Sequence, residues 1–235
     1  MMTLLQVNEI ETYIGQFHIL QGVTFQVKAG GITVLLGRNG AGKTTTLRSI
    51  MGLNPASKGE IHYKGERLDQ LPTHLIARKG VGYVPEDQGI FTDLTVGETM
   101  RIAMRGNSKE AAARLEWTME LFPDLRRFWN RKSGLLSGGQ KQMLAISRAY
   151  VNDNELLLID EPSKGLAPIM VEKLMEAIQQ MKEKTTVLLV EQNFLMASRI
   201  GSAYYMMDEG RVVKAGTMDE LRYDEETRRK YLGIA

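Results

Sequence analysis

Cysteine is absent from this sequence of 235 residues. Its absence excludes disulfide bonds, thiolate metal sites and cysteine nucleophiles, and it fits a protein that works in a reducing compartment. Histidine is scarce, with three residues at positions 18, 62 and 74. None of them lies in a pattern typical of a metal or catalytic site, so we interpret His18, His62 and His74 as surface or structural residues.

A strong charge imbalance and long apolar runs are also missing. The 30 basic and 28 acidic residues give a formal net charge of +2, whereas a nucleic-acid-binding protein usually has a marked basic excess. We therefore expect no nucleic-acid partner. Apolar runs such as residues 156–159 are far shorter than the roughly 20 residues of a membrane-spanning helix, and residues 1–9 do not resemble a secretory signal. If the protein works at a membrane, another chain must span it.

The chain does contain alternating strand and helix patterns. Short, continuous apolar runs are typical of strands buried on both faces of a parallel sheet, and they occupy residues 32–36, 81–84, 156–160 and 186–190. Helical patterns lie between and after these runs, at residues 44–51, 71–78, 140–150, 171–181 and 219–231. The first thirty residues alternate polar and apolar positions, as strands with one exposed face do. The order predicts an α/β fold with a mostly parallel central sheet.

A long helical pattern interrupts this alternation from about Val96 to Phe128. We interpret residues 86–134 as an inserted α-helical subdomain within one domain of residues 1–235. Residues 1–85 and 135–235 then form the remainder of that domain.

The segment from Gly37 to Thr44 matches the whole pattern G-x-x-x-x-G-K-[ST] of a phosphate-binding loop. It follows a predicted buried strand and opens a helix, as that motif requires. Glycines let successive backbone N–H groups face phosphates, Lys43 supplies a positive charge, and Thr44 offers a hydroxyl to Mg²⁺. The alternative, a chance glycine-rich turn, does not explain eight matching positions. The candidate ATP-binding residues are Gly37, Arg38, Asn39, Gly40, Ala41, Gly42, Lys43, Thr44 and Thr45.

Two acidic residues follow the aliphatic run 156–159. A buried parallel strand places them at the carboxyl edge of the sheet, where ligands bind in open α/β folds. Such a strand end is often only a solvated turn, but a phosphate-binding loop upstream favours a role in catalysis. We expect Asp160 to hold Mg²⁺ together with Thr44, and Glu161 to orient the attacking water.

The segment Leu136–Gln140, of sequence LSGGQ, lies between these two motifs. The three motifs in this order resemble ABC-type ATPases, and the resemblance covers essentially the whole chain. It implies a P-loop NTPase fold with an N-terminal antiparallel β subdomain and an inserted helical subdomain. It also implies that Ser137, Gly138, Gly139 and Gln140 close on the γ-phosphate of ATP held by the other subunit of a dimer.

Further residues match family elements by position. Tyr13 resembles the aromatic residue that stacks on adenine, although a structural strand tyrosine is the alternative. The chain departs from the usual family pattern at three positions: Glu86 replaces glutamine in the Q-loop, Ala167 replaces aspartate in the D-loop, and Gln192 replaces histidine in the switch. We expect Glu86, Glu161 and Gln192 to be catalytic, with Glu86 also meeting Mg²⁺. Because Gln192 cannot carry a positive charge, hydrolysis is expected to be slow.

The strings VPE, GLAP and VEQN at these elements resemble the second ATPase subunit of branched-chain amino acid importers, the LivF type, and its urea-transporter relatives. This resemblance implies ATP and Mg²⁺ as cofactors and permease subunits as membrane partners. It further implies a second ATPase subunit, an extracytoplasmic solute-binding protein and a place at the cytoplasmic face of the membrane. Phe91, Trp117 and Trp129 are candidates for the permease contact, with packing in the core as the alternative.

Other functions stay open at this stage. A urea or amide importer shares the same motifs. A soluble ABC ATPase of iron–sulfur assembly has a similar length, whereas a small-molecule kinase or a regulatory subunit fits Ser137–Gln140 and Glu161 less well.

Overall fold

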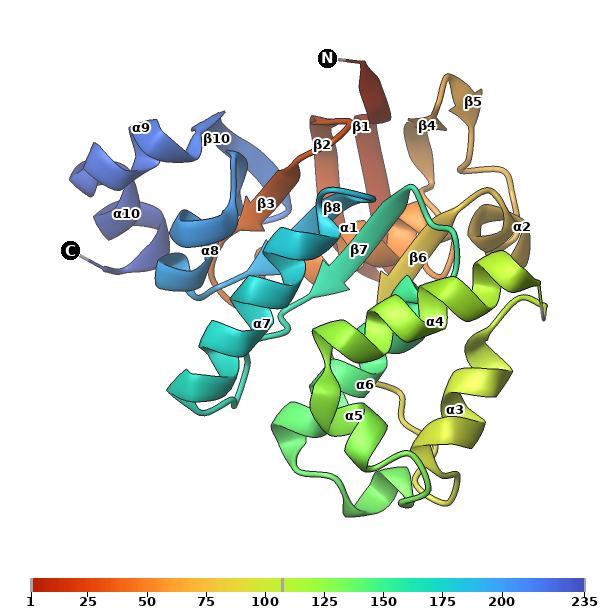
Figure 1. Cartoon of the computed structure of the whole chain (residues 1–235). Coiled ribbons are helices and arrows are strands. Elements are labelled where there is room, and N and C mark those ends of the chain that lie inside the picture. Colours follow the sequence, from red (N-terminus) through yellow and green to blue (C-terminus); the bar gives the residue numbers. More distant parts are fainter. Residues whose placement is uncertain (1, 107, 235) are drawn as a thin grey trace.

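The computed structural model describes residues 2–106 and 108–234, and a six-stranded sheet lies at its centre (Figure 1). Its strand order is β10-β9-β3-β8-β7-β6, and every neighbouring pair is parallel except the β9–β10 hairpin. This arrangement confirms the predicted mostly parallel sheet. The strands are β3 (Ile32–Leu36), β6 (Val81–Val84), β7 (Leu156–Asp160), β8 (Thr186–Glu191), β9 (Ala203–Asp208) and β10 (Arg211–Thr217).

A second sheet is antiparallel and comes mainly from the N-terminal part of the chain. Its order is β2-β1-β4-β5, and it contains β1 (Thr3–Ile14), β2 (Phe17–Lys28), β4 (Lys58–Tyr63) and β5 (Glu66–Arg67). Apolar residues of this sheet share one buried cluster with helix α1 (Lys43–Ile50) and with one face of the central sheet. The expected antiparallel β subdomain is therefore present.

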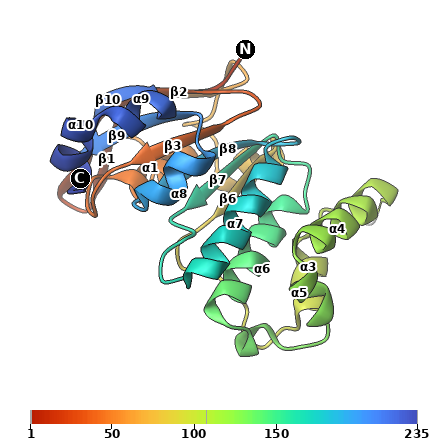
Figure 2. The same ribbon diagram turned by 60° about the vertical axis from the view of Figure 1, so that its left-hand side comes forward.

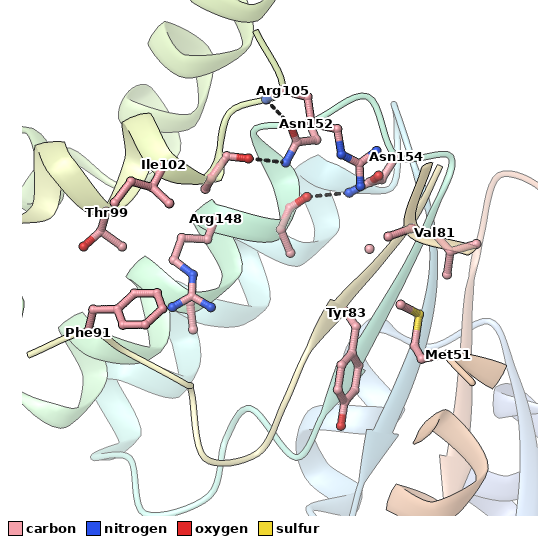
Figure 3. Close-up of a pocket in the computed structure, with 15 residues that line it drawn as sticks. Met51, Val81, Tyr83, Phe91, Thr99, Ile102, Arg105, Arg148, Asn152 and Asn154 are labelled. Carbon is pink, nitrogen blue, oxygen red and sulfur yellow. Dashed lines mark hydrogen bonds between the residues drawn. The ribbon is translucent and has the colours of Figure 1, made fainter. Parts of the chain in front are cut away.

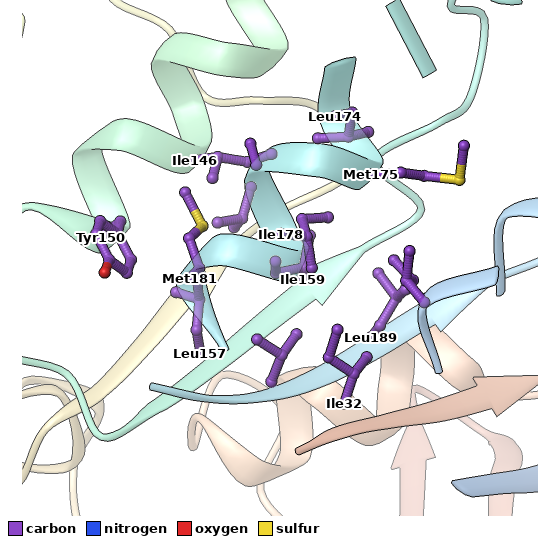
Figure 4. Close-up of a cluster of buried hydrophobic side chains, with 14 of the residues drawn as sticks. Ile32, Ile146, Tyr150, Leu157, Ile159, Leu174, Met175, Ile178, Met181 and Leu189 are labelled. Atoms are coloured by element: carbon purple, nitrogen blue, oxygen red, sulfur yellow. The ribbon is translucent and has the colours of Figure 1, made fainter. Parts of the chain in front are cut away.

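The central strands are buried on both faces, as their continuous apolar runs predict. Side chains alternate between faces along a strand, so Leu156 and Leu158 join the cluster with α1, whereas Leu157 and Ile159 join a second cluster. In the second cluster they pack beneath α7 (Pro168–Met181), through residues such as Ile178 (Figure 4). Helices α6 (Gly138–Tyr150) and α8 (Phe194–Ile200) belong to the same cluster. Because both faces of the central sheet are covered, a ligand can reach it only at the ends of the strands.

Three helices lie to one side of the sheets, within the predicted insertion (Figure 2). They are α3 (Val96–Ala103), α4 (Lys109–Leu121) and α5 (Pro123–Arg127), so the helical pattern expected from about Val96 to Phe128 consists of three helices. Capping explains the boundaries: Thr95 and Glu98 form a capping box at α3, Ser108 caps α4, and Pro123 occupies the first turn of α5.

The remaining elements are short. They are α2 (Thr73–Arg78), the 3-10 turn Ser133–Leu135, α9 (Met218–Tyr223) and α10 (Glu225–Leu232). The predicted helical tail is thus divided at Asp224, whose side chain caps α10 by accepting a hydrogen bond from the Thr227 N–H. Across residues 2–106 and 108–234, no helix is long and apolar enough to cross a membrane.

Candidate functional site

The glycine-rich loop connects the end of β3 to the start of α1 and depends on its glycines. Gly40 and Gly42 have φ angles of +83° and +100°, which favour glycine. A Cβ on Gly37 would lie 2.3 Å from the Met207 carbonyl oxygen. Gly42 occupies the cap position of α1, and no side chain of the described residues caps this helix. Its first N–H groups therefore remain available to an anion.

Lys43 is buried with its amine turned back into this loop. Its Nζ donates hydrogen bonds to the carbonyl oxygens of Gly37, at 2.8 Å, and Arg38, at 3.1 Å. It also lies 3.1 Å from Oε1 of Glu161, which is equally buried. A buried ammonium group needs such partners, and bound phosphate oxygens would replace them. The amine is thus already at the position where a phosphate would be held.

Asp160 ends β7 and faces the start of α1. Its Oδ1 accepts a hydrogen bond from the Thr44 hydroxyl at 3.1 Å, whereas its Oδ2 is buried with no hydrogen-bond partner among the described residues. Burial raises the pKa of Asp160 to about 6, with the charges of Glu161 and Glu86 acting in the same direction and Thr44 in the opposite one. A cation would satisfy the free oxygen and offset the burial. The Thr44 and Asp160 oxygens are the hard ligands that Mg²⁺ prefers.

Glu161 has a strained backbone immediately after this strand. Its φ angle is +42°, a left-handed conformation that costs a side-chain-bearing residue about 1–3 kcal/mol. Its N–H donates to the Val190 carbonyl at 2.9 Å, which ties it to the neighbouring strand β8. The surrounding structure therefore holds the carboxylate beside Lys43, at the mouth of the glycine-rich loop.

Parallel pairing brings the other predicted residues to the same edge of the sheet. Leu36 pairs with Glu191, and Asp160 pairs with Val190, so the loop after β8 begins beside both the phosphate-binding loop and the acidic pair. Gln192, in this loop, is exposed. Glu86 follows β6 and binds Lys164, which lies in the loop after Glu161. The Glu86 carboxylate raises the pKa of the Lys164 amine.

The Ser137–Gln140 segment forms the start of α6. The Ser137 hydroxyl accepts a hydrogen bond from the Gln140 N–H at 3.3 Å, and the Gln140 side chain accepts one from the Ser137 N–H at 3.0 Å. Ser137 and Gly138 are exposed. Among the hydrogen bonds and ion pairs of the described residues, none joins this segment to the glycine-rich loop of the same chain.

Tyr13 lies near the end of β1 and is about half exposed. Its ring stacks on His18 of β2, with 4.3 Å between ring centroids and 6° between ring planes. Farther along β2, Leu20 lies against Gly42, since a Cβ on that glycine would be 2.8 Å from Leu20 Cδ2. The hairpin therefore belongs to the same side of the molecule as the phosphate-binding loop.

Comparisons with known proteins agree with this geometry. Residues 20–164 match the family model described as ABC transporter. The chain belongs to the ABC transporter family. The high-affinity branched-chain amino acid transport ATP-binding protein BraG of Pseudomonas aeruginosa is 40% identical over 98% of this chain and 100% of BraG. The probable branched-chain amino acid transport ATP-binding protein LivF of Archaeoglobus fulgidus is 37% identical over 93% of this chain and 94% of LivF. The lipopolysaccharide export system ATP-binding protein LptB of Escherichia coli K12 is 30% identical over 99% of this chain and 98% of LptB.

Solved structures show the same architecture. An ATP-binding subunit of an ABC transporter has 32% identity and a TM-score of 0.83, covering 98% of this chain and 96% of that one. A nucleotide-free ATP-binding cassette superposes over 100% of both chains with a TM-score of 0.86, although its identity is 23%. The predicted ABC ATPase fold is thereby confirmed.

Membership in the ABC transporter family defines the activity in outline. The chain is a nucleotide-binding, ATP-hydrolysing subunit of an ABC transporter. ATPase subunits of these transporters form dimers and work with permease subunits. A dimeric cassette bound to ADP and Pi is 26% identical to this chain, with a TM-score of 0.78 over 91% of this chain and 98% of that one.

Three residues at the site were not singled out in the sequence. His18 was interpreted as an isolated histidine, but the β1–β2 register places it against Tyr13. Lys164 lies in the D-loop and Glu191 in the string VEQN, but neither was given a role of its own. Lys164 binds Glu86, and Glu191 is the last residue of β8, directly before Gln192. A charged residue directly beside a motif was the available signal in both cases.

Proposed function

We propose that this chain is the ATPase subunit of an importer for branched-chain amino acids or a related small polar solute. The observation that carries the proposal is its identity of 40% to BraG and 37% to LivF, each over more than nine tenths of the chain, compared with 30% to LptB. The strings at Glu86, Gly165–Pro168 and Glu191–Asn193 support the same subfamily. A urea or amide importer remains the alternative for the solute.

In the proposed mechanism, the loop Gly37–Thr44 binds the ATP phosphates and Lys43 exchanges its carbonyl partners for phosphate oxygens. Thr44 and Asp160 would hold Mg²⁺, with Glu86 as a further candidate ligand. Bound Mg²⁺ offsets the negative charge that develops on the transferred phosphoryl group. Glu161 orients and polarises the attacking water, and Gln192 donates a hydrogen bond to the γ-phosphate. Tyr13 stacks on the adenine.

Each ATP site is completed by a second ATPase subunit, either a copy of this chain or a related partner. Ser137–Gln140 of that subunit would supply backbone and side-chain donors to the γ-phosphate. Ser137 and Gly138 are exposed, and no hydrogen bond among the described residues joins them to the phosphate-binding loop of the same chain, which supports a role across the dimer. The resulting closure would drive the permease.

The permease contact is proposed at a cavity between the helical insertion and the core (Figure 3). The cavity has a volume of about 340 Å³. Phe91 and Ile102 line it with more than half of each side chain exposed. Trp117 and Trp129 pack against the core instead, so Phe91 alone of the three predicted aromatic residues supports this contact. The chain would then act at the cytoplasmic face of the membrane, below an extracytoplasmic solute-binding protein.

An uptake assay tests the proposal. We expect cells that lack the gene to lose uptake of radiolabelled leucine, isoleucine and valine. Expression of the natural chain should restore it, whereas Glu161→Gln should not. Glu183→Gln, at an exposed glutamate remote from the site, serves as the control. Restored uptake of urea in place of these amino acids would transfer the assignment to the urea branch, and unchanged uptake of both would overturn the importer role.

A further inference from the structure

Glu191 is a buried carboxylate placed between two loops of the catalytic edge. It is the last residue of β8, and only 2% of the residue is exposed. Its Oε1 accepts a hydrogen bond from the Ser163 N–H at 3.1 Å. Its Oε2 accepts hydrogen bonds from the Gln192 N–H at 3.1 Å and the Asn193 N–H at 3.0 Å. One side chain thus holds the loop after β7 and the loop after β8.

No lysine, arginine or histidine of the described residues lies within 4 Å of this carboxylate. Burial raises the pKa of Glu191, as does the nearby charge of Glu161, while the backbone N–H groups act in the opposite direction. A buried carboxylate without a cation is costly unless it is well hydrogen-bonded. Here three backbone N–H groups donate to it, so the positions of those groups and of the carboxylate depend on one another.

The two loops carry different parts of the proposed machinery. Strands β7 and β8 are neighbours (Figure 1). Ser163 follows the water-orienting Glu161 by two residues and begins the D-loop, Ser163–Ala167. Gln192, the proposed γ-phosphate donor, follows Glu191 directly. A shift of the D-loop would therefore reach the backbone of Gln192 through a single side chain.

The residue on the other side of Gln192, Asn193, is also fixed by a hydrogen bond. The Asn193 side chain caps α8 by accepting a hydrogen bond from the Met196 N–H at 3.1 Å. The backbone of Gln192 consequently lies between two anchored residues, Glu191 and Asn193. The Gln192 side chain is exposed, but the direction in which it leaves the backbone is set by these contacts.

We propose that Glu191 is a positioning residue for ATP hydrolysis, and that its carboxylate couples the D-loop to Gln192. The inference rests on the proposed role of Gln192. Glu191 itself makes no contact with the reacting groups. It acts by keeping the Gln192 backbone in the position from which the side chain reaches the γ-phosphate, and by making that position respond to the D-loop.

The variant Glu191→Gln separates positioning from folding. The amide has nearly the same size and keeps one acceptor oxygen, but its NH₂ group faces backbone N–H donors and cannot accept their hydrogen bonds. With purified chain, we expect kcat for ATP hydrolysis to fall by about tenfold or more, the scale of one misplaced donor. The KM for ATP and the Kd for a fluorescent ATP analogue should stay within about twofold, because Lys43 and the glycine-rich loop are untouched.

A double-mutant cycle with Gln192→Ala tests whether Glu191 acts through Gln192. Gln192→Ala alone should lower kcat by about tenfold to a thousandfold. Added to that variant, Glu191→Gln should cause little further loss, since residues that act as a unit are not additive. Glu183→Gln, an exposed glutamate-to-glutamine change, should leave kcat and the cycle unchanged.

Several results would overturn the inference. They are an unchanged kcat in Glu191→Gln, a loss of nucleotide binding that parallels the loss of kcat, multiplicative effects in the cycle, or full activity of Gln192→Ala. The variant Glu161→Gln distinguishes failure of the proposed catalytic assignment from failure of the inference about Glu191. If that variant hydrolyses ATP at the natural rate, the assignment itself is wrong, whatever the result for Glu191.

Discussion

At the residue scale, the catalytic edge brings acidic side chains close together and pairs them with lysines. Lys43 is buried between Glu161 and two carbonyl oxygens, so phosphate binding must exchange these partners. Lys164 binds Glu86 at an exposed position, where an ion pair contributes little to stability. Glu86 was predicted as a metal ligand, and the structure gives its carboxylate a competing partner.

Replacing Lys164 tests whether Glu86 meets Mg²⁺. In Lys164→Ala the Glu86 carboxylate is released and the site becomes more negative. We therefore expect the free Mg²⁺ concentration for half-maximal ATPase activity to fall by about twofold to fivefold, the scale of an exposed ion pair. Lys173→Ala is the control, because Lys173 is also exposed and lies on α7. It should leave the magnesium dependence unchanged. If both variants have the same magnesium dependence, Glu86 is not a metal ligand.

At the element scale, close packing within the helical insertion joins α3 to the segment that follows α5. The Gly97 N–H donates to the Trp129 carbonyl at 2.8 Å. A Cβ at Gly97 would lie 2.6 Å from the Trp129 ring, so the indole occupies the space that a side chain would need. This contact explains why Trp129 packs inward and is not available for the permease.

Gly97→Ala should therefore destabilise the chain although alanine favours helices. Overpacking costs typically 1–3 kcal/mol, and helix propensity returns up to about 1 kcal/mol. We expect the thermal unfolding midpoint to fall by about 2–8 °C, measured by circular dichroism. Gly138→Ala is the matched control, since Gly138 also lies in a first helical turn and a Cβ there meets no atom within 4 Å. A midpoint for Gly97→Ala at or above that of the control would contradict this packing argument.

At the scale of the whole molecule, we propose that one chain contributes to two different ATP sites of the dimer. The phosphate-binding loop and acidic pair would form one half of a site, and the exposed start of α6 would form one half of the other. Ser137 serves its own helix as a cap, which does not require a glycine-rich sequence after it. Gly139 is buried, and a Cβ there would lie 2.6 Å from Cε of Met170, so packing within the chain accounts for this glycine. Gly138 is exposed and a Cβ there meets no atom within 4 Å, so we attribute this glycine to close approach of a phosphate from the other subunit.

Ser137→Ala should abolish ATP-driven dimer formation while leaving nucleotide binding within about twofold. Sedimentation velocity with and without MgATP measures dimer formation, in a Glu161→Gln background that slows hydrolysis. Loss of the cap alone costs about 1 kcal/mol. Ser108→Ala is the matched control, because Ser108 caps α4 in the same way and lies outside the site. Equal dimerisation of both variants would exclude a role of Ser137 across the interface.

Much of the fold and most of the candidate site could be predicted from the chain itself. Continuous apolar runs marked the central strands, because a strand covered on both faces has no polar positions. Gly37–Thr44 could be recognised because curling a backbone around phosphate requires glycines at set spacings. The sequence did not predict all helix boundaries: the helical run 96–128 begins after the cap at Thr95 and is divided by the cap at Ser108 and by Pro123, since local hydrogen bonds compete with propensity.

The sequence alone therefore determined which residues have the chemistry for ATP hydrolysis and which strands are buried. Only the tertiary structure decided which of those residues meet. Parallel pairing in the order β3-β8-β7-β6 brings Lys43, Glu161 and Gln192 to one edge from distant positions in the chain. The same pairing gives Glu191 and Lys164 their partners, and the antiparallel β1–β2 hairpin gives His18 its partner Tyr13, because a charge or a ring acquires a specific contact only when another segment folds against it.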